Sequence, residues 1–468
     1  MTRNGQNRSV ASGFAFSAIF WLIVSLLAGL WLAAEMFLPA LNVFPWLSFG
    51  RLRVVHTNGL VFGFSLAGIF ACSYYMLEKL TRTPLAFPRL ARVHLRLFNV
   101  AIALAALSLL AGMNTSKEYA ELEWPLDAVI VAVWVMFSVN VLGTLVKRRE
   151  KQMYVSLWFM IATVVTVAVV FILNNLEVPV SLFKSYSIYA GVNDANVQWW
   201  YGHNAVASIF TFPILAMFYY FLPVSTGVPI YSHRLSIIAF WSLVFGYLWT
   251  GAHHLMFTPV PEWIQTVALA FSLFLIAPSW GSVVNGYCTM SGNWERVKGN
   301  YLTKFFLLGI TFYGLQTVQG PTQALRSLTS LFHYTEWVVG HVHMGTMGWV
   351  TMIISASLYY LVTRVSGREV YSVRLANVHF WLILVGQLLF TTTLWIAGIM
   401  QGTMWKATNP DGSLTYSFLD SVAALYPYWK IRFAAGVIYF LGILVFAFNL
   451  VMTARGPGRG GASGEKAR

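Results

Sequence analysis

Charged residues are scarce in this chain, and that scarcity excludes most soluble folds. Only 10% of the 468 residues are charged, against about 25% in soluble domains, while 58% are hydrophobic. The sequence therefore describes an integral membrane protein. Cysteine is also rare: Cys72 and Cys288 are too few and too far apart for a disulfide framework, and no C-x-x-C-H motif for covalent haem attachment occurs.

Long apolar runs are what the chain has in abundance. We identify twelve that are long enough to span a bilayer. They cover residues 14–34, 54–77, 95–113, 126–146, 153–173, 197–222, 234–257, 262–286, 302–325, 337–362, 376–400 and 430–453. We detect no internal repeat and no soluble domain, so residues 1–455 are predicted to form one all-α domain of twelve transmembrane helices. The Gly-rich, charged tail over 456–468 is predicted to be disordered.

The net charge of +14 does not indicate a nucleic-acid partner, because the basic residues are sorted by side. Of the 30 lysines and arginines, 22 lie on the side of the amino terminus and 8 lie opposite, whereas 11 of the 16 acids lie opposite. Lysine and arginine mark the cytoplasmic side of a membrane protein. Both termini are therefore predicted to be cytoplasmic, with the lipid bilayer as the chain's surroundings.

Six of the ten histidines fall in the outer halves of their spans or near the outer edge, where outer means the side opposite the cytoplasm. They are His56, His203, His253, His254, His341 and His343. Neutral imidazole is a good ligand for copper and haem iron, so six of them at one depth indicate metals. His341 and His343 leave opposite sides of one helix, ~200° apart, and are expected to serve two different cofactors. The adjacent pair His253 and His254 can reach one metal if the helix end is slightly distorted.

The remaining histidines are assigned simpler roles. His94 and His233 lie among arginines at the cytoplasmic edge and are expected on the solvated surface. His379 is expected to make a structural hydrogen bond, and His333 lies on the outer side.

Several stretches together make the chain resemble the catalytic subunit (subunit I) of C-family, cbb₃-type haem–copper cytochrome c oxidases. They are Val55–Asn58, Val197–Asn204, the sequence YLWTGAHH ending at His254, Ala277–Gly281, and His333–Trp337 leading into Gly340–His343. The resemblance covers essentially all twelve spans and implies the haem–copper oxidase subunit I fold.

The resemblance also implies a role for each of the six histidines. His56 and His343 would be the axial ligands of a low-spin haem b, and His341 the axial ligand of a high-spin haem b. The copper ion would be held by the other three, His203, His253 and His254.

Tyr247 would be the active-site tyrosine, which this family joins covalently to the copper ligand His203. It would supply the fourth electron, and a proton, for breaking the dioxygen bond. Independently of the resemblance, Tyr247 and His254 are seven residues apart and share one helix face.

Partners for the haem propionates are expected at the outer edge of the spans. The candidates are Arg53, Trp199, Trp200, His333 and Arg432. In the family a calcium ion bridges the propionates, and a glutamate of the third outer segment contributes to it. Glu118 matches that glutamate best, and Glu121 is the alternative.

Protons must reach Tyr247 from the cytoplasm, and Ser236 lies three turns below it on the same face. Tyr219, Tyr220, Tyr313 and Gln316 extend the polar path in the one channel that the resemblance implies. The alternative is that these residues make scattered helix–helix hydrogen bonds and form no proton path.

The chain departs from the family at three positions. Gln319 stands where members usually have a glutamate, Ala239 replaces a common histidine, and Ala252 replaces the usual proline.

The function implied is that of a terminal oxidase in a bacterial inner membrane, reducing dioxygen to water with proton uptake and translocation. Because the chain lacks a covalent haem motif, electrons from cytochrome c would arrive through membrane-anchored c-type cytochrome subunits. A nitric oxide reductase of the same superfamily is one alternative, although no acid falls inside a span near the histidines. A non-enzymatic di-haem electron carrier is the other, but it would leave the copper set without a role.

Overall fold

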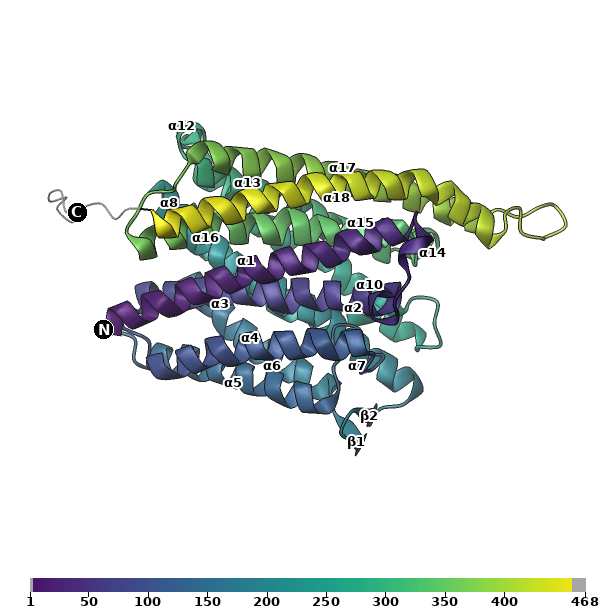
Figure 1. Ribbon diagram of the computed structural model, residues 1–468, viewed down its shortest axis with the longest axis horizontal. Coiled ribbons are helices and arrows are strands. Elements are labelled where there is room, and N and C mark those ends of the chain that lie inside the picture. Colours follow the sequence, from purple (N-terminus) through teal and green to yellow (C-terminus); the bar gives the residue numbers. More distant parts are fainter. Residues whose placement is uncertain (1–2, 457–468) are drawn as a thin grey trace.

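The computed structural model describes residues 3–456, which form a bundle of long helices running side by side (Figure 1). The α-helices are α1 (Arg3–Glu35), α2 (Phe49–Asn58), α3 (Leu66–Thr81), α4 (Pro88–Ala111), α5 (Trp124–Val146), α6 (Val155–Asn174), α7 (Gly191–Ala205), α8 (Phe212–Thr226), α9 (His233–Tyr247), α10 (Glu262–Phe274), α11 (Ile276–Met290), α12 (Trp294–Gly299), α13 (Tyr301–Ala324), α14 (Arg326–Phe332), α15 (Glu336–His343), α16 (Thr351–Ser366), α17 (Val373–Lys406) and α18 (Phe418–Arg455). An antiparallel hairpin of β1 (Glu177–Ser181) and β2 (Lys184–Ser187) projects from one end. The predicted disordered tail lies, Gly456 apart, outside the described residues.

Shorter helical segments link or interrupt these helices. Three are π-helical, namely η3 (Gly59–Ser65), η4 (Val206–Thr211) and η6 (Met344–Val350). Three others are 3-10 turns, namely η1 (Pro39–Leu41), η2 (Pro45–Leu47) and η5 (Gly251–Leu255).

Ten helical stretches in residues 3–456 are long and apolar enough to cross a membrane, which confirms a multi-pass membrane protein. The other two expected spans correspond to α9, which has only 15 residues, and to α13, which is less apolar. The count of twelve therefore stays a prediction. The first turns of α1 and the last turns of α18 lie at the same end of the bundle, opposite the β-hairpin (Figure 1). That both ends are cytoplasmic also stays a prediction.

Local chemistry sets where several helices begin and end. The side chains of Ser232 and Ser372 cap α9 and α17 by accepting a hydrogen bond from the backbone N–H three residues on. Gly227 and Gly367 end α8 and α16 with φ of +69° and +68°, a conformation that glycine adopts without strain.

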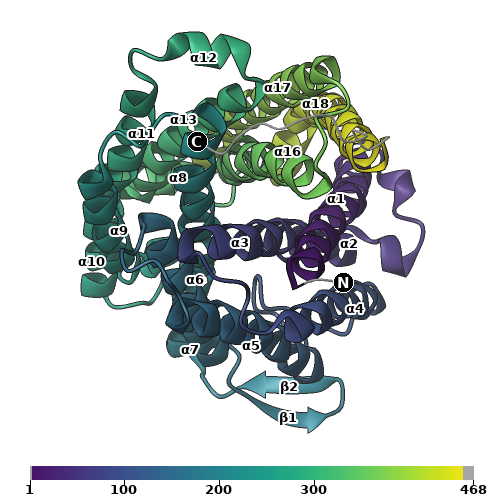
Figure 2. The ribbon, with the colours of Figure 1, turned by 90° about the vertical axis from the view of Figure 1, so that its left-hand side faces the viewer.

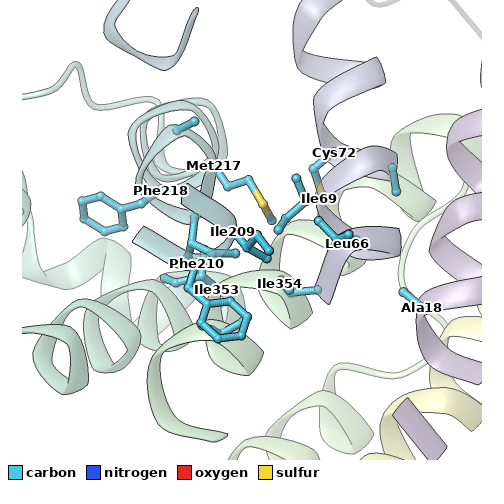
Figure 3. Packing of buried hydrophobic residues seen from close by; sticks show 14 of the residues in the cluster. Ala18, Leu66, Ile69, Cys72, Ile209, Phe210, Met217, Phe218, Ile353 and Ile354 are labelled. Atoms are coloured by element: carbon cyan, nitrogen blue, oxygen red, sulfur yellow. The ribbon is translucent and has the colours of Figure 1, made fainter. Parts of the chain in front are cut away.

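Three rods occupy the middle of the bundle. They are α2–η3–α3, α7–η4–α8 and α15–η6–α16, and the end-on view in Figure 2 shows α3, α8 and α16 surrounded by the other helices. The most apolar windows of these rods are 89%, 94% and 94% buried, whereas no other span exceeds 50%. Figure 3 shows their common seam, where Ile69 of α3, Met217 of α8 and Ile354 of α16 approach one another. The candidate ligands His56, His203, His341 and His343 all lie on these three buried rods.

The structure corrects the statement that the chain has no internal repeat. Each central rod is followed by outer helices, giving repeat A (α2 to α5), repeat B (α7 to α11) and repeat C (α15 to α18). Each repeat has a tyrosine on its central rod. The backbone N–H of the residue thirteen positions later donates a hydrogen bond to a buried asparagine on the last helix of the repeat. These sets are Tyr74, Phe87 and Asn140 (3.2 Å), Tyr219, Ser232 and Asn285 (2.9 Å), and Tyr359, Ser372 and Asn449 (3.1 Å).

A threonine four residues after each asparagine accepts a second backbone N–H. The three threonines are Thr144, Thr289 and Thr453, each at 3.0 Å. The repeat escapes notice in the sequence because its identical residues are few and about 150 residues apart.

The prediction for His94 was wrong. Its side chain is fully buried, and its Nδ1 lies 2.8 Å from the hydroxyl of Tyr74. His379 occupies the same position in repeat C, buried and 3.4 Å from the hydroxyl of Tyr359, so its expected structural hydrogen bond is present. His233 is exposed, as expected.

Candidate functional site

Three histidines from two elements converge near one end of the bundle. His203 lies at the end of α7, and His253 and His254 lie on η5, which continues α9. One ligand nitrogen from each comes within 4.8 Å of the others. The 3-10 winding of η5 is the expected distortion that lets adjacent residues face one point. Gly251 permits the approach, because a Cβ there would lie 2.5 Å from the carbonyl oxygen of Trp199.

Two hydroxyls determine which nitrogen of each imidazole faces that point. The Nδ1 of His203 lies 2.7 Å from Thr250 Oγ1, and the Nδ1 of His253 lies 2.6 Å from Ser272 Oγ. Both hydroxyls donate their own hydrogen to a backbone carbonyl, of Tyr247 and Ala268 respectively, so each accepts from the imidazole Nδ1–H. The Nε2 lone pair of each ring is therefore left for a metal.

His56 and His343 form a second pair. Their ring centroids are 6.5 Å apart, and the ring planes differ by only 14°. Each Nδ1 donates to a backbone carbonyl, that of Ser25 for His56 (2.7 Å) and that of Val339 for His343 (2.8 Å). Both Nε2 atoms are again free, and a porphyrin iron between two imidazoles needs this arrangement.

His343 lies beside His56, so His341, ~200° away around the same helix, faces the opposite side. It lies within electrostatic range of His203, His253 and His254, whereas His343 interacts with His56. Its Nδ1 lies 3.3 Å from the amide oxygen of Gln319. The helix between His341 and His343 thus separates two potential metal sites, as the sequence spacing predicts.

Comparison with known proteins identifies the family. The family described as Cytochrome C and Quinol oxidase polypeptide I matches residues 9–438. The cbb3-type cytochrome c oxidase subunit CcoN1 of Stutzerimonas stutzeri is 45% identical, covering 97% of this chain and 96% of its own length. The chain belongs to the cbb₃-type branch of this oxidase family.

Other relatives include a second oxidase subunit, a more distant nitric oxide reductase and a solved oxidase structure. The cytochrome c oxidase subunit 1 of Rhodobacter capsulatus is 41% identical over 93% of this chain and 83% of its own. A nitric oxide reductase subunit of Stutzerimonas stutzeri is 25% identical over 97% of this chain and 96% of its own. A solved haem-copper terminal oxidase dimer shares the fold, with a TM-score of 0.76 at 17% identity over 96% of this chain and 84% of its own.

Haem and copper are the cofactors of this oxidase family, and the donor sets fit them. Imidazole nitrogens are the ligands that copper and haem iron take. The three-histidine cluster offers three nitrogen donors around one point, and the His56–His343 pair offers two facing imidazoles, so both sets match what a copper ion and a haem iron can take.

Tyr247 lies beside the cluster. Its ring centroid is 5.5 Å from that of His203, and its hydroxyl lies 3.0 Å from Thr211 Oγ1. Tyr313, which donates to Ser279 Oγ at 3.1 Å, interacts with both Tyr247 and Tyr219.

The other residues expected on the proton path are placed less uniformly. Ser236 is buried and donates to the carbonyl of His233. Tyr220 points instead toward Tyr75, with ring centroids 6.4 Å apart, and Gln316 packs on Gly345.

The expected propionate partners have other contacts in the structure. Trp199 stacks on His254 at 4.0 Å, and Trp200 donates its indole N–H to the carbonyl of Leu248. His333 stacks on the exposed ring of Tyr334 at 3.9 Å.

The two arginines differ in burial. Arg53 pairs with Glu118 at 3.6 Å, and both side chains are more than a third exposed. Arg432 is mostly buried, and its Nη1 lies 3.2 Å from Glu336 Oε2.

Glu121, the alternative calcium ligand, is buried. Its Oε2 accepts from the side chain of Asn58 at 2.9 Å, and its Oε1 has no partner among residues 3–456. Burial raises the pKa of Glu121 above its usual value, and the Asn58 hydrogen bond partly offsets this shift.

Sequence reasoning missed four groups of the site. Thr250, Ser272 and Thr211 carry no signal, because single hydroxyl residues are common in membrane helices. Glu336 lies within the motif from His333 to Trp337 but received no role. It is buried, accepts from the indole of Trp429 at 2.7 Å and pairs with Arg432. The available signal was an acid directly after a threonine at the start of an apolar span that carries two histidines.

Proposed function

We propose that this chain reduces dioxygen to water as the catalytic subunit of a respiratory oxidase, using two haems b and one copper. The convergence of His203, His253 and His254, with Tyr247 beside them and His341 facing them, carries the proposal. The family membership and the 45% identity to a cbb3-type oxidase subunit support it.

The protein's part begins with holding the metals. His203, His253 and His254 would hold copper, His341 the high-spin haem, and His56 with His343 the low-spin haem. Bound iron and copper would supply the dioxygen binding and most of the electrons. Thr250 and Ser272 hold two of the imidazoles in one tautomer, so that the site is formed before the metal binds.

Tyr247 would supply a proton and an electron to the substrate oxygen from its hydroxyl. Thr211 Oγ1 lies within hydrogen-bond distance and fixes that hydroxyl near His203. Protons consumed by the reaction would come from the cytoplasm through Ser236, Tyr219 and Tyr313, and the reaction would be coupled to proton translocation. Tyr220 and Gln316 face other parts of the bundle and are left out of this path.

The outer edge would bind the propionates through Arg53, Trp199, Trp200, His333 and Arg432. A calcium ion would lie beside Glu118, with Glu121 as the alternative ligand. Membrane-anchored subunits with c-type haem would deliver electrons from cytochrome c, because this sequence has no covalent haem motif. The assembly would lie in a bacterial inner membrane, as the relatives are bacterial.

Metal analysis of the purified protein with its carbon monoxide difference spectrum tests the proposal. We expect two haems and one copper per chain, with carbon monoxide binding to one haem only. A chain with haem but without copper would instead favour nitric oxide reduction or a di-haem carrier. The structure disfavours nitric oxide reduction, since the metal-ligand cluster found in residues 3–456 contains no carboxylate.

A further inference from the structure

The hairpin of β1 and β2 turns an apolar face to its surroundings. Val178 of β1 pairs with Tyr186 of β2, and both side chains are more than half exposed. Six large apolar side chains in and beside the hairpin are exposed to this extent, namely Val178, Val180, Leu182, Phe183, Tyr186 and Ile188. A contiguous exposed apolar patch marks a surface that contacts another apolar body.

The opposite face of the hairpin is polar and is attached to the bundle. Ser185 is buried, and its hydroxyl lies 2.7 Å from Glu123 Oε2. The ammonium of Lys184 pairs with the other carboxylate oxygen of Glu123 at 3.6 Å. The indole N–H of Trp124, the first residue of α5, donates to the carbonyl oxygen of Ser181 at 2.9 Å. These contacts fix which face of the hairpin points outward.

This arrangement reverses the one that a hairpin adopts in water. An antiparallel sheet with one solvated face turns its polar side chains outward and its apolar ones inward. Strands that face lipid show the opposite pattern, as this hairpin does. A two-stranded hairpin is also only marginally stable in water unless its apolar face is covered. The sheet therefore needs an apolar cover on its outward side.

The apolar surface of the neighbouring span continues into the hairpin. α6 has 20 residues, so its length of ~30 Å matches the hydrocarbon thickness of a bilayer. β1 begins three residues after α6 ends, at the level where the headgroups begin. Ile172, Leu173 and Leu176 are exposed over this stretch and join the outward face of α6 to that of the hairpin.

The placement of the two strands fits the surface of a membrane. In the end-on view of Figure 2 they lie at the rim of the bundle, beyond α5, and run across the helix axes. Tryptophan and tyrosine are enriched at membrane interfaces, and lysine extends its ammonium toward the headgroups there. Trp124 and Tyr186 supply such rings, and the ammonium of Lys184 lies 5.1 Å from the ring centroid of Tyr186.

We propose that this hairpin lies in the bilayer interface and inserts its six exposed apolar side chains among the lipids of the adjacent leaflet. The polar face stays against the bundle through Ser185, Lys184 and Trp124. The hairpin thus anchors the rim of the bundle beside α5 and α6 to the membrane surface. This inference goes beyond dioxygen reduction and does not depend on it.

Spin labels on the hairpin test the proposal in the whole oxidase, reconstituted with its partner subunits in lipid nanodiscs. Nitroxides at V180C and L182C are introduced in a C288S background, since Cys72 is buried. Collisions are then measured with oxygen, which partitions into lipid, and with a water-soluble nickel chelate. We expect oxygen to relax both labels more strongly than the nickel chelate does, with the haem spectrum as a check on folding.

Two matched positions calibrate the measurement. Val139 is exposed in the middle of α5, so V139C should show a still larger preference for oxygen. Ser413 lies in the exposed turn between α17 and α18, and S413C should show a preference for the nickel chelate. Fluorescence quenching adds a measure of depth: a bimane label at V180C should be quenched more by lipids with a doxyl group at carbon 5 than at carbon 12.

The other outcomes would overturn the proposal. A preference for the nickel chelate at V180C and L182C, equal to that at S413C, would place the hairpin in water. Poor access of both reagents would show that a partner subunit covers the hairpin instead of lipid. A protein without copper would refute the proposed function, yet the label accessibilities would still decide where the hairpin lies.

Discussion

The hydroxyls of Thr250 and Ser272 are the most direct test of how this fold prepares its copper site. Thr250 accepts from the Nδ1–H of His203, and Ser272 accepts from that of His253. Removing either hydroxyl, by Thr-to-Val or Ser-to-Ala substitution, frees the ring to rotate or to change tautomer. Loss of such an outer partner typically weakens metal binding about 10- to 100-fold, which is roughly 1.4–2.7 kcal/mol.

We expect T250V and S272A each to weaken copper binding by about that factor while retaining both haems. Copper affinity is measured by competition with a copper chelator on the purified protein, with the haem spectrum as a check on folding.

T258V is the matched control for T250V. Thr258 also donates to a backbone carbonyl, that of Leu255 at 2.6 Å, but its side chain has no hydrogen bond to a histidine within residues 3–456. It should lose the same kind of hydrogen bond and keep wild-type copper affinity. Equal affinities for T250V, S272A and T258V would refute the view that these hydroxyls set the ligand geometry.

Three further predictions follow from other contacts. E336Q leaves the mostly buried Arg432 without its carboxylate partner. We therefore expect a loss of about 3–5 kcal/mol in the free energy of unfolding, seen as a lower thermal midpoint. A wild-type midpoint in E336Q would contradict this expected loss. Q319E places a carboxylate at the Nδ1 of His341. Because a charged acceptor makes the imidazole more basic, the midpoint potential of the high-spin haem should fall in a redox titration. A potential that stays the same or rises would count against that hydrogen bond. The raised pKa of Glu121 means that the folded protein binds the carboxyl proton more tightly than the unfolded chain does. Burying this carboxyl therefore costs no stability below the unfolded pKa of 4.5. The cost grows as the pH rises above that value and is complete above the folded pKa. With calcium chelated, E121Q should therefore match the wild type in acid and exceed it in thermal stability at neutral pH, and a difference that ran the other way would exclude a destabilising buried carboxylate.

Polar residues in an apolar chain proved to be the best guides to the site. His203, His253 and His254 meet as their depth in the spans indicates, and His341 and His343 diverge as their spacing requires. Depth and helical phase follow from sequence position alone, because a helix has a fixed rise and twist. The same reasoning failed for His94, since its position near the membrane edge says nothing about which neighbour covers it.

The sequence by itself determined the class of the protein, its multiple spans and the layer in which the imidazoles lie, because hydropathy and helical periodicity are local properties of the chain. The tertiary structure alone decided which nitrogen of each ring faces a metal, which acid neutralises Arg432 and which side chain bonds to the buried His94. Those features depend on side chains from helices that lie far apart in the sequence. Which of them come together is fixed only when the helices pack.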